Sequence, residues 1–104
     1  MEPFKISEPE FNLAKDYLKQ LLHFNTSPSN PRNETEAIIY VREILNHSGI
    51  HYDLIETPKK RLNLIARLKG NGKKKPLLLS SHIDTVKFKD AEWSINPLSA
   101  EEKN

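Results

Sequence analysis

Hydrophobic residues recur at helical spacing near the start of the chain. Ser7 and Glu10 fit the S-x-x-E capping box, and an apolar stripe follows them, so the pattern predicts a helix over residues 7–24. The stripe consists of Phe11, Ala14, Leu18, Leu21 and Leu22. We expect this face of the helix to pack into a core.

A second helix is predicted after a polar loop, residues 25–33, that contains two prolines. Asn33 is its expected N-cap, and Glu36 three residues later suits the positive end of the helix. Gly49 is the expected stop at the C-terminal end. The apolar stripe of this helix is Ala37, Ile38, Val41, Ile44 and Leu45.

The pattern changes to short apolar runs after Gly49. Strands are expected at residues 50–56, 63–69 and 77–83, with Thr57-Pro58 ending the first. Gly70-Asn71-Gly72-Lys73 is a hairpin signal between the second and the third. The unbroken run Leu77-Leu78-Leu79 predicts a strand covered on both faces. Helices followed by such strands predict an α/β fold with a layered sheet, and residues 86–104 are expected to be loop-like.

Composition narrows the classes of function. The chain has 104 residues, one small domain or part of a larger one, and no cysteine, so any metal ligands must be His, Asp or Glu. Its net charge of +2 is too small to argue for nucleic-acid binding. No apolar run approaches the roughly 18 residues of a membrane span, and no signal region is visible, so we expect a cytoplasmic protein without membrane contact.

The chemistry-bearing residues are four histidines. His23 and His47 fall near the ends of the predicted helices, where the helix dipole favours them, so both are interpreted as structural. His82 and Asp84 form H-x-D directly after the apolar run. In an extended chain residues i and i+2 point to the same side, so Asp84 can accept one ring N–H of His82 and leave the other nitrogen for a metal.

This spacing is weak on its own. About half an H-x-[DE] match is expected by chance in a chain of this composition. His51-Tyr52-Asp53 is a second H-x-D, which precedes no buried apolar run and serves as an internal control. Context therefore has to separate the two pairs.

The segment from Leu77 to Val86, with Trp93 and Pro97 after it, resembles a known family. It is similar to the co-catalytic zinc hydrolases that include aminoacylase, acetylornithine deacetylase, succinyl-diaminopimelate desuccinylase and glutamate carboxypeptidase. Their first metal motif is an apolar strand ending in H-x-D-T/V-V, followed by W-x-x-x-P-F. The upstream helices, the Thr-Ser-Pro loop and the paired strands also match, so the resemblance covers most of the chain.

The resemblance implies a role for two residues. His82 matches a zinc ligand, and Asp84 matches the active-site aspartate that orients that histidine without binding metal itself. Leu98 stands where the family usually has Phe. Residues 1–104 would be the N-terminal part of the catalytic domain, a partial zinc-exopeptidase-like three-layer sandwich with a mixed sheet, incomplete at its C-terminus. The bridging Asp, the general base and the other ligands would lie outside the chain, and Glu101-Glu102 are interpreted as solvated.

The implied activity is hydrolysis of peptides or N-acyl amino acids by metal-activated water. The complete enzyme would hold two zinc ions, with cobalt as an alternative, and a homodimer is one expected form. The isolated chain is expected to be inactive. A different class stays open, a stand-alone non-catalytic α/β module that binds a partner. The lysine run 73–75 is either a phosphate contact or a solvated hairpin tip, and nucleic-acid binding through it is not expected.

Overall fold

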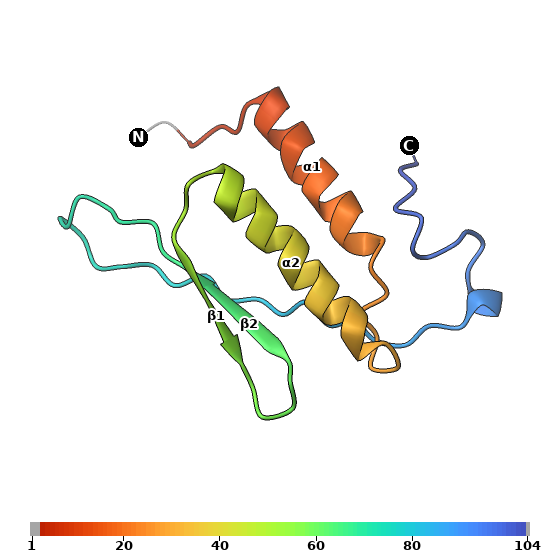
Figure 1. The fold of residues 1–104 in the computed structure, drawn as a ribbon. Helices are drawn as coiled ribbons and strands as arrows, with labels where there is room; N and C mark the ends of the chain where they lie inside the picture. The colour runs from red at the N-terminus through yellow and green to blue at the C-terminus, as the bar shows by residue number, and fades with distance from the viewer. Residues whose placement is uncertain (1–2, 104) are drawn as a thin grey trace. The chain divides into compact units, whose positions relative to one another are not determined.

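The computed structural model describes residues 3–103. The chain divides into two compact parts, residues 3–24 with 88–103 and residues 25–87 (Figure 1). Within residues 3–103, neither helix combines the length and the apolar character that crossing a membrane requires.

Helix α1, Glu8–Leu22, begins at the predicted cap. The Ser7 hydroxyl accepts the Glu10 backbone N–H at 3.3 Å, and the Ser7 backbone N–H donates to the Glu10 carboxylate at 2.8 Å. These two bonds form a capping box, which satisfies donors that the first turn leaves unpaired. The Ser7 backbone N–H and the Ser7 hydroxyl each donate to the Glu10 carboxylate at 2.8 Å, and these two donors lower the pKa of Glu10 below its ordinary value.

The expected burial of the α1 stripe is wrong for the described residues. No residue of α1 is buried, and Phe11, Leu18 and Leu22 are 52%, 57% and 41% exposed. Helical periodicity reports an amphipathic face but not what covers it. Residues 88–103 of the same part are loop-like as predicted, apart from a single short 3₁₀ helix, η1 (Asp90–Glu92).

Helix α2, Pro31–His47, starts earlier than expected. Asn30 is its N-cap, so the prediction of Asn33 is wrong. Pro31 takes the first helical position, where a missing N–H is harmless. The Asn33 side-chain amide instead donates to the Asn25 backbone carbonyl at 3.0 Å and holds the preceding loop.

The end of α2 is the predicted one. Gly49 has a φ of +66°, the left-handed conformation that glycine adopts at little steric cost. The Gly49 N–H donates to the Asn46 carbonyl at 3.2 Å, and the Ile50 N–H donates to the Leu45 carbonyl at 3.0 Å. This pair of bonds is a Schellman motif, which satisfies the last free carbonyls of the helix.

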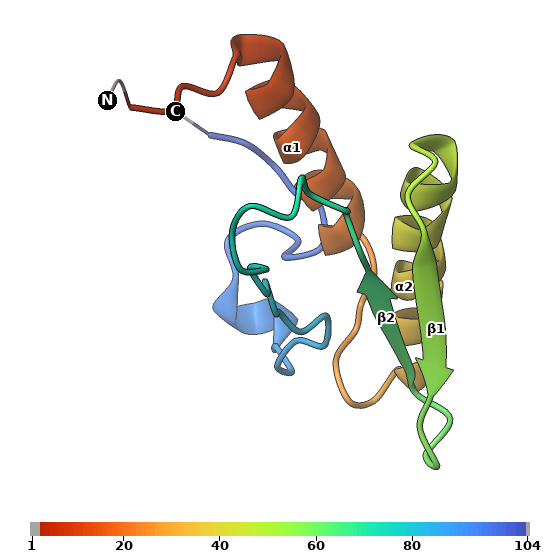
Figure 2. The same ribbon diagram turned by 90° about the vertical axis from the view of Figure 1, so that its left-hand side faces the viewer.

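Two of the three predicted strands form an antiparallel hairpin. Strand β1, Tyr52–Glu56, pairs with β2, Leu62–Ala66, and Leu54 lies opposite Leu64. The connection turns through Lys60, with a φ of +57°. Helix α2 lies along one face of the hairpin (Figures 1 and 2). Ala37 and Ile38 of α2 are buried, as the second stripe predicted.

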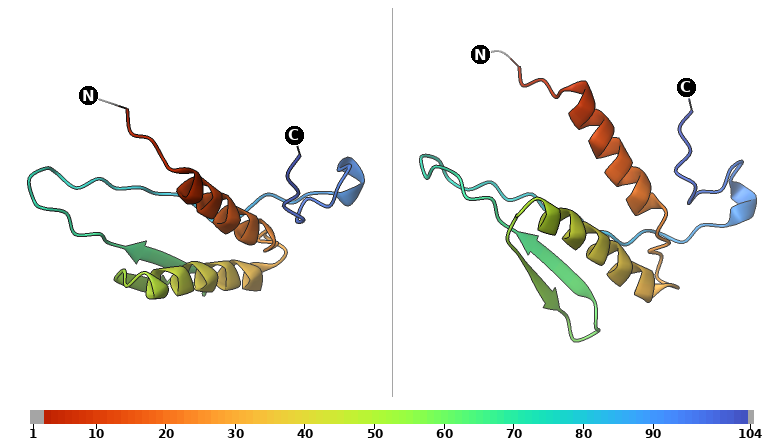
Figure 3. Two further views of the ribbon diagram at one scale, coloured as in Figure 1. Left: turned by 90° about the horizontal axis from the view of Figure 1, so that it is seen from above. Right: turned by 45° about the horizontal axis from the view of Figure 1, so that its top comes forward.

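The third predicted strand, residues 77–83, is not a strand. Leu77, Leu78 and Leu79 are 83%, 85% and 84% exposed, and no ladder forms around Gly70-Asn71-Gly72-Lys73, so the hairpin expected there is also wrong. Figure 3 shows residues 67–86 in a wide loop that leaves the hairpin and then returns. A strand needs partner N–H and C=O groups, and residues 3–103 supply none to this segment. The mixed α/β class is confirmed, whereas the three-layer sandwich stays a prediction.

Candidate functional site

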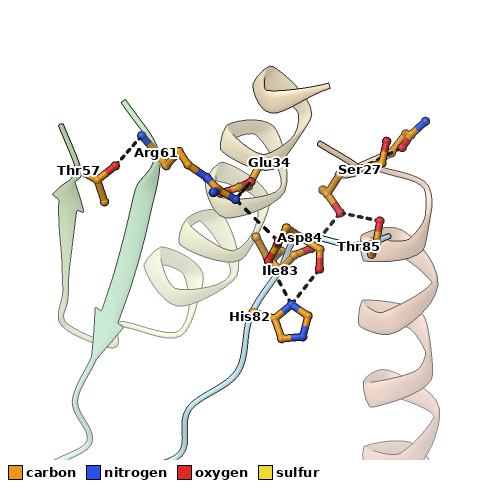
Figure 4. A network of polar contacts seen from close by, with 10 residues as sticks. Ser27, Glu34, Thr57, Arg61, His82, Ile83, Asp84 and Thr85 are labelled. Atoms are coloured by element: carbon orange, nitrogen blue, oxygen red, sulfur yellow. Dashed lines mark hydrogen bonds and ion pairs between the residues drawn. The ribbon is translucent and has the colours of Figure 1, made fainter. Parts of the chain in front are cut away.

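The H-x-D segment is anchored by the loop before α2. Thr26 is buried, its hydroxyl donates to the Ile83 carbonyl at 2.9 Å, and its own carbonyl accepts the Thr85 N–H at 3.3 Å. Two bonds from one residue therefore fix the backbone on both sides of Asp84. Figure 4 shows this segment beside the loop residue Ser27, which is also buried.

The His82 ring faces two acceptors of Asp84. Its Nδ1 lies 2.8 Å from the Asp84 backbone carbonyl and 3.1 Å from the Asp84 Oδ1 (Figure 4). A carbonyl oxygen only accepts, so Nδ1 carries the ring proton and the lone pair of the neutral ring lies on Nε2. The His82 side chain is 83% exposed, which leaves Nε2 accessible. The approach of Asp84 to the ring that the i+2 spacing predicted is present.

Asp84 also faces a cation that the sequence analysis missed. Its Oδ2 lies 3.8 Å from Nη2 of Arg61, the residue directly before β2. Arg61 in turn binds Glu34 of α2 through two bonds, Nε to Oε1 at 3.0 Å and Nη2 to Oε2 at 2.7 Å. Hydrogen bonding and charge from Glu34, then charge from Asp84, raise the pKa of Arg61. No spacing rule links these residues, because the fold of α2 onto the hairpin brings them together.

The control pair is arranged differently. His51 Nε2 lies 3.9 Å from Asp53 Oδ1, beyond hydrogen-bonding distance, and no arginine or lysine pairs with Asp53 among residues 3–103. The two H-x-D matches are therefore separated by geometry, as their sequence context indicated.

The remaining histidines bond main-chain carbonyls. His23 is the C-cap of α1, and its Nδ1 lies 2.8 Å from the Leu98 carbonyl. His47 lies in the last turn of α2, and its Nδ1 lies 2.8 Å from the Glu43 carbonyl. Both placements at helix ends are the predicted ones, and both rings use a nitrogen to hold backbone.

The His82–Asp84 pair can supply one protein ligand to a metal ion. Within residues 3–103 there is no group of three or more His, Asp or Glu side chains that could hold a metal. Zinc in catalytic sites takes about three protein ligands. His82, with Nε2 free and Nδ1–H directed at a carboxylate, has the arrangement of a zinc-ligating histidine and its supporting carboxylate. The described residues therefore fit a single ligand.

Two groups of charged side chains outside this site were also interpreted from the sequence, Glu101-Glu102 and the lysine run 73–75. Glu102 was expected to be solvated. Its exposed carboxylate in fact forms ion pairs with Lys15 at 2.8 Å and Lys19 at 2.9 Å. These two lysines hold the pKa of Glu102 down to about 2. Residues 73–75 are exposed, in a loop and not at a hairpin tip.

The chain is similar over most of its length to acetylornithine deacetylases. It is 33% identical to the enzyme of Aliivibrio fischeri over 100 residues, 92% of this chain and 25% of that protein. It is 34% identical to the enzyme of Vibrio parahaemolyticus over 81 residues, 77% of this chain and 21% of that protein. It is 31% identical to the enzyme of Aliivibrio salmonicida over 100 residues, 92% of this chain and 25% of that protein.

The chain therefore resembles the acetylornithine deacetylase family. This is the family that the H-x-D motif and its surroundings resembled, and its named members here are hydrolases. The chain spans about a quarter of the length of these relatives. No family model matches the chain, and no solved structure matches it.

Proposed function

We propose that this chain is the N-terminal, metal-binding segment of a zinc-dependent hydrolase that cleaves an amide bond of an N-acyl amino acid or a peptide. The relatives are named acetylornithine deacetylase, so an N-acetylated amino acid is the first substrate to test. Because the chain spans about a quarter of those relatives, the activity is assigned to the complete catalytic domain and not to residues 1–104 alone.

His82 and Asp84 have distinct roles in this proposal. The Asp84 carboxylate accepts a hydrogen bond from the Nδ1–H of His82. This bond fixes the ring and leaves Nε2 free to bind a metal ion. Zinc, or cobalt in its place, when bound activates water for attack on the amide carbon. The second ion, the other ligands and the general base are expected from residues outside this chain.

One observation carries the proposal. Nδ1 of His82 is occupied by two acceptors of Asp84 while Nε2 stays exposed, and the control pair lacks this arrangement. His23 and His47 also have Nδ1 held by a main-chain carbonyl, so the supporting carboxylate is the feature that sets His82 apart.

A second candidate is a non-catalytic α/β module that binds a partner. The observation in its favour is that residues 3–103 offer no cluster of three metal-ligating side chains. The reading frame beyond the codon for Asn104 distinguishes this candidate from the first. An in-frame continuation with further Asp, Glu and His ligands supports the hydrolase, and a stop codon supports the module.

The test compares His82→Ala with the matched change His51→Ala in the complete natural protein. Zinc content and hydrolysis of N-acetylornithine are measured for both variants. His82→Ala should lose activity and one metal ligand, whereas His51→Ala should retain both, because its ring makes no bond to Asp53. Equal losses in the two variants would remove the reason for choosing His82.

A further inference from the structure

The two oxygens of the Asp84 carboxylate point to different partners. Oδ1 lies 3.1 Å from the His82 ring, and Oδ2 lies 3.8 Å from the Arg61 guanidinium. Figure 4 shows Asp84 between these two side chains. The Asp84 side chain is 45% exposed, so it would be free to rotate in solvent without these partners. Attraction from both sides fixes the plane of the carboxylate.

Arg61 is itself held in place. It forms a two-bond fork with Glu34, and only 12% of the Glu34 side chain is exposed. Such bidentate pairs fix the plane of the guanidinium, which a lysine at this position cannot reproduce. Glu34 comes from the first turn of α2, and Arg61 from the end of the β1–β2 connection. The fork therefore places a positive charge at a set point beside Asp84.

We propose that Arg61, held by Glu34, is a positioning residue that orients the Asp84 carboxylate toward His82. At 3.8 Å the Arg61–Asp84 contact is longer than a hydrogen bond, so it acts through charge attraction and not through a shared proton. Its consequence for metal binding rests on the proposed function, but its effect on the Asp84–His82 bond does not.

A purely structural role would look different. The fork also joins α2 to the hairpin, so loss of Arg61 could lower the stability of residues 25–87 without changing the His82 ring. The test therefore needs a signal from the ring itself. The proton on His82 Nδ1 is such a signal, because its resonance reports the strength of its bonds to the Asp84 carbonyl and carboxylate, and of these two acceptors only the carboxylate faces Arg61.

The experiment uses the complete natural protein, metal-free and labelled with ¹⁵N-histidine, at a pH where the ring is neutral. The variants are Arg61→Met, Arg61→Lys and Glu34→Gln. Arg67→Met is the matched control, because Arg67 lies in the same part of the chain, is exposed and has no ion pair among residues 3–103. Zinc affinity is then measured by competition with a chromophoric chelator.

Arg61→Met should move the His82 Nδ1–H resonance upfield and weaken zinc binding about 10-fold, the lower end of the range for an indirect partner of a metal ligand. Arg61→Lys should give a smaller change, and Arg67→Met none. An unchanged resonance in folded Arg61→Met would overturn the proposal. If Arg61→Met does not fold, Glu34→Gln decides in the same way. A natural protein that binds no zinc would contradict the proposed function, whereas the metal-free resonance would still decide this inference.

Discussion

The four histidines of this chain differ in the hydrogen-bond partners of their rings. His23 and His47 bond main-chain carbonyls at the ends of α1 and α2. His51 stands too far from Asp53 to bond it. Only the His82 ring meets a main-chain carbonyl and a carboxylate of the same residue, among residues 3–103. The chemistry of each imidazole therefore depends on partners at the distance of a hydrogen bond.

Glu102 is the residue whose charge depends most visibly on its neighbours. Lys15 and Lys19 lower its pKa from 4.5 to about 2. A carboxyl group with a depressed pKa stabilises the folded state above its unfolded pKa, and that contribution is lost as the pH falls toward 2. Lys19 has its own pKa raised by the same contact.

We predict that the Glu102 carboxyl titrates near pH 2 in the wild type and returns toward 4.5 in the double variant Lys15→Met/Lys19→Met. Carboxyl ¹³C shifts followed over a pH series measure this. Glu101 serves as the internal control, because its nearest cation, Lys103, is 3.9 Å away. Since the pair is exposed, the shift should shrink at high salt. A Glu102 pKa unaffected by loss of both lysines would contradict the assignment.

At the scale of elements, the ends of the helices show how far local rules reach. The capping box of α1 and the Gly49 stop of α2 involve contacts within a few residues, and both were predicted. The start of α2 was misplaced by three residues, because Asn33 is as good a cap by type as Asn30. The Asn33 amide is used instead to bind the carbonyl of Asn25.

Gly49 gives a direct test of the helix end. Apart from its two chain neighbours, no residue comes within 4 Å of the position that a Cβ of residue 49 would take, so the cost of Gly49→Ala comes from the φ of +66°. A left-handed conformation costs an L-residue about 1–2 kcal/mol, and we expect the free energy of unfolding to fall by about that amount. Gly70→Ala is the control, since its surroundings are equally open and its φ is not positive. Urea denaturation measures both, and equal stabilities would contradict the prediction.

At the scale of the whole molecule, the exposed leucines stand out. Leu68, Leu77, Leu78 and Leu79 are all more than 80% exposed. The three consecutive leucines carry free backbone groups as well, because no strand pairs with them among residues 3–103. Uncharged β-prone segments with open edges associate with other chains.

We predict that the 104-residue chain, expressed alone, self-associates through this segment. The double variant Leu77→Lys/Leu79→Lys should be monomeric at concentrations where the wild type forms larger species, as measured by light scattering. Ser80→Lys/Ser81→Lys adds the same charge to two exposed neighbours and should associate more than the leucine variant. A wild-type chain that stays monomeric would contradict the prediction.

The amino-acid sequence by itself determined the features that depend on near neighbours along the chain. It predicted two helices, one capping box, the Gly49 stop and the approach of Asp84 to His82, because each rests on contacts between residues up to about five positions apart. It also predicted two of the strands, which pair across a short connection, from Glu56 opposite Leu62 to Tyr52 opposite Ala66. It also carried the motif that points to the acetylornithine deacetylase family.

Only the tertiary structure decided what lies beside these features. It brought Glu34 and Arg61 to Asp84 from positions 27 residues apart from each other, since α2 lies along the hairpin. It also left the α1 stripe and the leucine run uncovered within residues 3–103, against expectation. The physical reason is that periodicity and apolar runs record a preference for burial, whereas burial itself requires a partner surface that the pattern along one segment does not contain.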